Sequence, residues 1–187
     1  MKATLHWAGI AVGVVAGLLI LGILVLYSAG RMRLNKKYEV PPEMIAIPND
    51  AESLNEGKRI FQYRGCEACH GEQLQGLIYL DNPAIGQVIT PNLTSGQGGI
   101  GAQRTDKDLI RAIKHGIRPD GTPLLFMPST EFYFLSNTDL GKVLAYIRKV
   151  PPVKNEMQPS KLSFSGFAVM NVMKDITFLP AELIPHD

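Results

Sequence analysis

Cysteine is scarce in this chain of 187 residues, which has two cysteines and four histidines. Both cysteines lie in the segment Cys66-Glu67-Ala68-Cys69, and no second pair follows elsewhere. A structural zinc site needs four Cys or His ligands, usually from two separated pairs, so this scarcity argues against zinc. The flanking sequence also lacks the βαβ pattern of a thioredoxin-like redox pair. A simple disulfide stays open for a protein exported to an oxidising compartment.

A basic surplus is absent from most of the chain. Five of the 19 Lys and Arg residues and one of the 17 Asp and Glu residues precede Pro41, which leaves 14 basic against 16 acidic residues from there to Asp187. The net charge of this part is therefore near −2, although the net charge of the whole chain is +2. Because nucleic-acid-binding domains carry clustered basic charge, we expect no nucleic-acid partner.

Charge is missing altogether from Trp7 to Tyr27. This run meets the requirement of about 20 apolar residues for a helix that spans a lipid bilayer. A cleavable signal peptide has an apolar core of only about 7–15 residues, although Ser28-Ala29-Gly30 could serve as a cleavage site. We therefore expect residues 1–30 to form a retained, single-pass transmembrane anchor.

The predicted anchor carries a face of small residues, Gly9, Gly13 and Gly17, spaced every fourth position. Such a face lets another transmembrane helix approach closely, which makes subunits of a membrane complex candidate partners beside the lipid bilayer. Four basic residues follow within 31–37. They favour a cytoplasmic position for the rest of the chain by the positive-inside tendency, or they contact anionic lipid headgroups.

What the chain does have is one Cys-x-x-Cys-His motif, because His70 directly follows Cys69. The spacing of three residues places Cys66 and Cys69 on one face of a helical turn, where each thiol can add to one haem vinyl group. His70 then lies beneath the iron as an axial ligand. A disulfide or a redox pair does not require this histidine, so the motif predicts one covalently attached haem c.

The chain after the anchor divides into three parts. Residues 31–49, which contain Pro41-Pro42 and Pro48, predict an extended juxtamembrane linker. Residues 50–152 predict an all-α domain, because the stretch 71–103 is rich in Gly, Pro and Asn and shows no alternating strand pattern. Residues 153–187 are too apolar for a free tail and either fold back or dock on a neighbour. Three helix starts are signalled, at Ser53-x-x-Glu56, Thr105-x-x-Asp108 and Ser136-x-x-Asp139.

A haem iron held by His70 leaves one axial position for another side chain. Met127 is the favoured ligand, because it lies on the loop between the second and third predicted domain helices, and His/Met pairs are a known choice in cytochromes c. His115 would give a bis-His site instead, although its position at a helix C-terminus already explains it. The remaining methionines considered are Met44, Met157, Met170 and Met173.

Residues 50–152 resemble a class I cytochrome c, a fold of three or more helices and long loops around one haem, here preceded by one transmembrane helix. The resemblance rests on a helix leading into Cys66-x-x-Cys69-His70-Gly71, the methionine loop and a closing helix. It implies that the first and last domain helices cross through Gly57, Phe61 and Tyr146.

The segments Gly86–Thr94 and Leu135–Val153 are similar to the single haem modules of membrane dehydrogenase cytochrome c subunits. That likeness implies that the Pro83 carbonyl accepts the ring N–H of His70. It also implies that Thr90, Asn92 and Arg104 contact the haem propionates.

These features predict a one-electron carrier that is not an enzyme. We expect a bacterial cell-membrane protein whose haem domain lies on the outer, periplasmic side, because c-type haem is attached there and large domains cross membranes regardless of charge. Its partners would be subunits of a respiratory or photosynthetic redox complex. The alternative is a haem-based gas sensor or peroxidase-like enzyme in which Met127 is displaceable.

Overall fold

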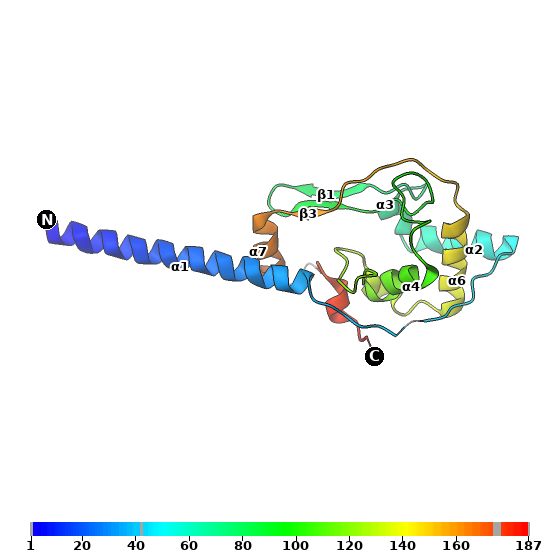
Figure 1. Cartoon of the computed structure of the whole chain (residues 1–187), viewed down its shortest axis with the longest axis horizontal. Helices are drawn as coiled ribbons and strands as arrows, with labels where there is room; N and C mark the ends of the chain where they lie inside the picture. Colours follow the sequence, from blue (N-terminus) through cyan, green and yellow to red (C-terminus); the bar gives the residue numbers. More distant parts are fainter. Residues whose placement is uncertain (1, 42, 174–176, 187) are drawn as a thin grey trace.

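The computed structural model describes residues 2–41, 43–173 and 177–186. It begins with a helix, α1 (Lys2–Leu34), that projects from the rest of the molecule as a rod (Figure 1). At 1.5 Å per residue the helix is about 50 Å long. The side chains from His6 to Val25 are all exposed, and Leu18 and Leu19 are each 63% exposed. Among the described residues, only this helix is long and apolar enough to cross a membrane. Met1, Pro42, residues 174–176 and Asp187, which belong to the predicted anchor, linker and extension, lie outside the description.

Helices make up most of the regular secondary structure of the compact part, as expected. Its helices are α2 (Ala51–Tyr63), α3 (Cys66–His70), α4 (Asp106–His115), α5 (Ser129–Phe132), α6 (Asn137–Lys149), α7 (Phe164–Val172) and the 3-10 helix η1 (Pro180–Leu183).

Side-chain caps define the start of four of these helices, α2, α4, α6 and α7. Thr105 and Asp108 form a reciprocal capping box at α4, and Ser136 accepts a hydrogen bond from the Asp139 N–H at α6, as predicted. The predicted cap of α2 is wrong, because Asp50 rather than Ser53 is the N-cap and Glu56 pairs with Arg59 instead. Residues three positions apart lie side by side on a helix surface, so the Glu56 carboxylate can pair with Arg59 instead of accepting from the backbone.

Helices α2 and α6 cross closely at Gly57. A Cβ atom at this position would overlap the backbone carbonyl of Lys142 on α6. The ring of Phe61 meets that of Tyr146 edge to face, with centroids 5.5 Å apart. Around this crossing lies the main hydrophobic core. The contact that the family resemblance implied is therefore present.

A small antiparallel sheet corrects the all-α expectation. Its strands are β1 (Ile78–Asn82), β2 (Gly86–Ile89) and β3 (Lys161–Leu162), in the order β1-β2-β3. The side chains of β1 are mostly exposed on both faces, so its sequence has no inward-facing alternation to detect. β3 has two residues and comes from the distant C-terminal extension, so it forms only by long-range pairing.

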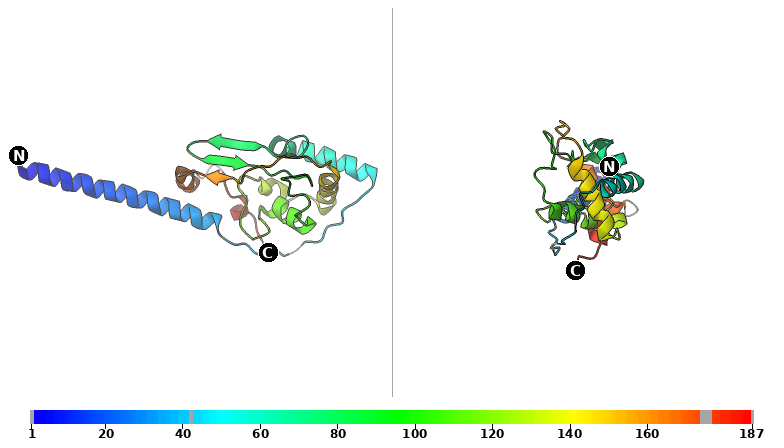
Figure 2. Two further views of the ribbon diagram at one scale, coloured as in Figure 1. Left: turned by 45° about the horizontal axis from the view of Figure 1, so that its top comes forward. Right: turned by 90° about the vertical axis from the view of Figure 1, so that its right-hand side faces the viewer.

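The C-terminal extension folds back over the molecule. It passes along the sheet to α7, which packs against the end of α1, and then returns through η1 (Figures 1 and 2). Phe167, Met170, Phe178 and Leu179 of this extension form a second buried core with Tyr27 and Leu34 at its margin. Of the two alternatives expected for residues 153–187, folding back or docking on a neighbour, the structure shows that the segment folds back.

Candidate haem-binding site

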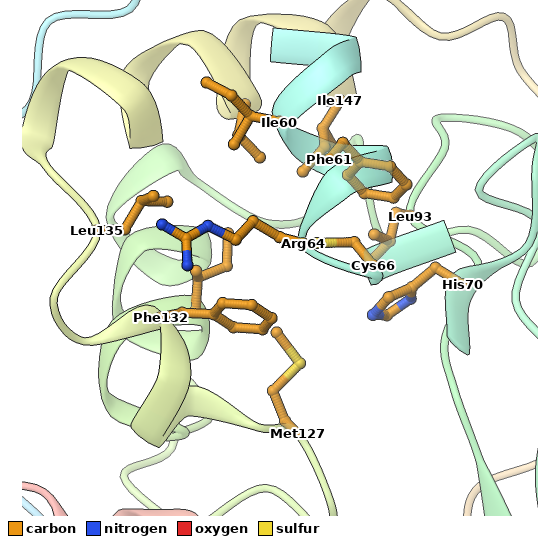
Figure 3. A pocket seen from close by; sticks show the side chains of 12 residues that line it. Ile60, Phe61, Arg64, Cys66, His70, Leu93, Met127, Phe132, Leu135 and Ile147 are labelled. Carbon is orange, nitrogen blue, oxygen red and sulfur yellow. The ribbon is translucent and has the colours of Figure 1, made fainter. Parts of the chain in front are cut away.

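An open cavity lies between α2, α3, α4, α5 and α6, with Met127 on its wall (Figure 3). Its empty space, counted together with the open solvent at its mouth, is about 410 Å³. Its lining is mainly apolar. The lining side chains are Ile60, Phe61, Arg64, Cys66, His70, Leu93, Ile113, Met127, Phe132, Leu135, Val143 and Ile147.

The two cysteines lie one helical turn apart on α3. Both are partly buried and neither forms a disulfide. Burial raises the pKa of the Cys66 thiol to about 11 and also raises the pKa of Cys69. Both groups are therefore protonated thiols at neutral pH, unlike the low-pKa cysteines of redox-active pairs. Their position fits the addition of S–H across vinyl groups, and Cys66 lines the cavity.

His70 is buried and lines the same cavity. Its Nδ1 lies 3.3 Å from the carbonyl oxygen of Pro91, which assigns the proton to Nδ1 and leaves Nε2 as the free acceptor. Burial lowers the pKa of this imidazole, although the Pro91 carbonyl opposes the shift, so the ring is neutral at pH 7. A neutral imidazole with one orienting hydrogen bond is the form that ligates a metal.

The partner of His70 corrects the expected role of Pro83. Pro83 lies in the exposed turn between β1 and β2, whereas Pro91 lies two residues after the end of β2. Thr90 brings this segment to α3, because its hydroxyl donates a hydrogen bond of 2.5 Å to the carbonyl of Cys69. The same hydroxyl accepts a bond of 2.9 Å from the N–H of Leu77. The family likeness implied Pro83, but the carbonyl beside His70 belongs to Pro91.

Met127 reaches the cavity from the loop that precedes α5, and its side chain and the His70 ring point into the same space (Figure 3). The loop is held on both sides of Met127. The Phe126 N–H donates to the Phe178 carbonyl at 3.0 Å, and the Ser129 hydroxyl donates to the Ala112 carbonyl at 3.0 Å. Phe126 itself has a φ of 56°, a left-handed conformation that a non-glycine residue adopts only when its surroundings impose it.

The other candidate ligands lie away from the cavity lining. Met157 receives a hydrogen bond from Asn155 at 3.2 Å, and Met170 is buried in the second core. Met44 and Met173 are exposed. His115 is buried but contacts Glu43 and His186 instead. Met127 is the one methionine that lines the cavity in the described part of the chain.

Two of the residues expected to contact the haem propionates, Thr90 and Asn92, bind other parts of the protein instead. Thr90 connects β2 to α3, and Asn92 is fully buried, donating to the Val153 carbonyl at 2.8 Å and accepting from both N–H and hydroxyl of Thr94. Their polar atoms are thus satisfied by the protein, and neither lines the cavity. Arg104 lies outside the lining as well, and its contact with a propionate stays a prediction.

Arg64 is a cavity residue that the sequence analysis missed. It precedes Gly65 and Cys66, and its side chain crosses the cavity in Figure 3. A cation two residues before the first cysteine is the only signal in the sequence that could have identified it. Its guanidinium supplies positive charge and hydrogen-bond donors that suit an anionic cofactor substituent.

Comparison with known proteins gives a consistent result. The profile of the family described as cytochrome c matches residues 54–151. The fructose dehydrogenase cytochrome subunit of Gluconobacter japonicus is 32% identical over 132 residues, which cover 66% of this chain and 27% of that protein. The cytochrome c subunit of the quinone alcohol dehydrogenase of Komagataeibacter europaeus is 31% identical over 125 residues, covering 63% of this chain and 26% of that subunit. The chain thus spans about a quarter of the length of these relatives. The predicted similarity to dehydrogenase cytochrome subunits is confirmed.

Proposed function

Since the chain belongs to the cytochrome c family, we propose that it carries single electrons at a membrane surface on one haem c. Cys66 and Cys69 would hold the haem covalently, and His70 and Met127 would be the two axial ligands. The observation that carries this proposal is the convergence of His70, Met127 and Cys66 on one apolar cavity. When bound, the haem supplies an iron that alternates between Fe(III) and Fe(II).

The residues around the cavity suit electron transfer better than catalysis. Two protein side chains on the iron leave no open position for a substrate. Pro91 fixes the orientation and tautomer of His70, and the Phe126–Phe178 and Ser129–Ala112 bonds hold the Met127 loop in place. A site whose ligands are held in advance changes little in geometry between its two oxidation states. The crossing of α2 and α6 at Gly57 further supports the class I arrangement for residues 50–152.

A membrane anchor is the second part of the proposal. The exposed apolar surface of α1 supports insertion in a lipid bilayer, and the covalent attachment of haem supports a periplasmic position for the compact part. Relatives named as cytochrome subunits of dehydrogenases support a partner that is a subunit of a membrane redox complex. The face of Gly9, Gly13 and Gly17 is open, since a Cβ at each would meet nothing within 4 Å, and could receive a partner helix.

The orientation and the partner are tested separately. Protease added to spheroplasts should digest the haem domain, whereas protection of that domain would contradict the periplasmic position. Gly13→Ile should reduce the subunits that co-purify in mild detergent, and Leu18→Ile on the same helix should not. Equal recovery with both variants would contradict a partner at the glycine face.

The electron-carrier function is tested by redox titration of the haem-loaded chain in detergent. Absorbance against potential should follow one transition with a one-electron slope of about 59 mV per decade. Met127→Ala should lower the midpoint potential, because a thioether ligand raises it. Met44→Ala, at an exposed methionine, should leave it unchanged. A midpoint that responds equally to both substitutions would contradict Met127 ligation.

A further inference from the structure

Helix α7 is fixed across the end of α1. At Gly30 the two backbones approach so closely that a Cβ would lie 2.7 Å from the Phe167 carbonyl. Asn171 donates to the Leu26 carbonyl at 2.8 Å, and Arg33 donates to the Met170 carbonyl at 2.8 Å. Arg33 also forms two hydrogen bonds, of 2.9 and 2.6 Å, with the carboxylate of Glu182. These contacts hold α7 against the end of α1, and Arg33 also joins α1 to η1.

One face of α7 is apolar and only partly covered by α1. Phe164, Ala168 and Val172 follow one another at four-residue spacing and so share a face. Phe164 is 52% exposed and Val172 is 65% exposed. No charged residue occurs from Leu162 to Met173. An apolar helix face left open in this way marks a contact with something outside the chain.

The position of α7 along α1 indicates what that contact is. Trp7 and Tyr27 are 20 residues apart, so at 1.5 Å per residue they flank about 30 Å of helix, the thickness of a bilayer's hydrocarbon core. Trp and Tyr are enriched at both edges of that core. Phe164 stacks on Tyr27 with ring centroids 4.8 Å apart, and Arg31 lies over the ring of Phe167 at 5.7 Å. α7 thus lies where the apolar surface of α1 gives way to basic residues.

The direction of α7 agrees with this position. It runs across α1 rather than along it in both side views of the molecule (Figures 1 and 2). With α1 spanning the bilayer, α7 therefore lies in the plane of the membrane surface, as interfacial helices do. Arg31 and Lys36 would meet anionic headgroups at the same level, whereas Arg33 is paired with Glu182 and Lys37 with Asp120.

We propose that α7 is a second membrane contact, which inserts the face of Phe164, Ala168 and Val172 into the lipid at the headgroup boundary. This inference rests on the proposed anchoring by α1. α7 shares its core with Phe126, which precedes Met127, and with Phe178, which binds the Phe126 backbone. The lipid contact therefore sets the orientation of the haem cavity relative to the membrane surface.

Site-directed spin labelling tests the proposal on the haem-loaded full chain. Because Cys66 and Cys69 are taken up by the haem, a single introduced cysteine can be labelled in vesicles of phosphatidylethanolamine and phosphatidylglycerol. The variants are Phe164→Cys and Val172→Cys on α7, Ile20→Cys in the middle of α1, and Phe134→Cys as a control that is 86% exposed outside α7. Accessibility to oxygen and to a water-soluble nickel chelate is measured against a nitrogen reference, which removes relaxation by the haem iron.

Labels at 164, 172 and 20 should show an oxygen-to-nickel accessibility ratio several-fold higher than the label at 134. A high ratio at 20 with a ratio at 164 and 172 equal to that at 134 would overturn the role of α7 and leave the anchor intact. A low ratio at 20 would overturn the anchor and α7 together. Low accessibility of the labels at 164 and 172 to both reagents would mean that protein covers this face of α7. A high oxygen-to-nickel ratio at 134 would mean that the domain inserts unspecifically. Either result overturns the proposal.

Discussion

His115 is a buried histidine that makes stability depend on pH. Burial lowers its pKa, and the hydrogen bond with Glu43 only partly opposes that shift. The unfolded chain therefore binds a proton more readily than the folded chain below the ordinary histidine pKa of about 6.5. Stability from this group is present above that pH and is lost as the pH falls below it.

The pH dependence can be assigned to His115 by substitution. Burial tends to raise the pKa of Glu43, but hydrogen bonds from Lys114 and His115 outweigh it and lower that pKa. The stability that Glu43 adds is therefore fully present above about pH 4.5, and it makes stability vary with pH only below that value. Between about pH 6.5 and 5, His115→Gln should therefore flatten the fall of the free energy of unfolding, measured by urea unfolding of the haem-loaded chain. A slope equal to that of the native chain over this interval would contradict the prediction.

Single residues of the site were predictable where their spacing is local. Cys66, Cys69 and His70 lie within one turn of helix, so the sequence alone places them together. Met127 could be singled out by its loop, and the structure puts it on the same cavity. The carbonyl beside His70 was not predictable, because Pro83 and Pro91 occupy one long loop and only the pairing of β1 with β2 separates them.

At the scale of elements, α2 and α6 can cross closely because glycine at position 57 has no side chain. Gly57→Ala forces its Cβ into the Lys142 carbonyl and should lower the free energy of unfolding by about 1–3 kcal/mol, the usual cost of overpacking. Asn55→Ala, on the exposed side of the same helix, should change it by less than about 0.5 kcal/mol. Chemical denaturation of both variants with haem attached is the measurement. Stabilisation by Gly57→Ala, as in an uncrowded helix, would show that the helices do not cross there.

Elements with local signals were predicted and those built from distant pairing were not. α4 and α6 begin at the capping residues expected from the sequence, and α4 ends at Gly116, whose φ is 66°. The sheet was missed, because β1 is exposed and β3 is a two-residue strand supplied some seventy positions after β2. Secondary structure of this kind exists only once the C-terminal extension has folded back.

The whole molecule links the membrane end to the methionine loop through the extension. The Phe178 ring lies 4.7 Å from the ring of Phe126, and its carbonyl accepts the Phe126 N–H. Phe178 is 1% exposed, so Phe178→Ala should cost about 3–5 kcal/mol in the free energy of unfolding. It should also weaken the thioether-to-iron charge-transfer band at the red end of the oxidised spectrum, because the Met127 loop loses its support.

Phe134→Ala is the matched control, since Phe134 is 86% exposed. It should leave both the stability and the charge-transfer band unchanged. A destabilised Phe178→Ala protein with a full charge-transfer band would show that the extension supports the fold without supporting Met127.

Carbon monoxide binding tests the central claim, that His70 and Met127 together close the iron to external ligands. Carbon monoxide is added at neutral pH to the reduced, haem-loaded chain in vesicles, and the absorbance change is followed for the native chain and for Met127→Ala. We predict no rapid change in the native chain and rapid binding in Met127→Ala, because only the variant has an open axial position. Rapid binding by the native chain would contradict a closed electron carrier and would favour a haem-based sensor or peroxidase-like enzyme.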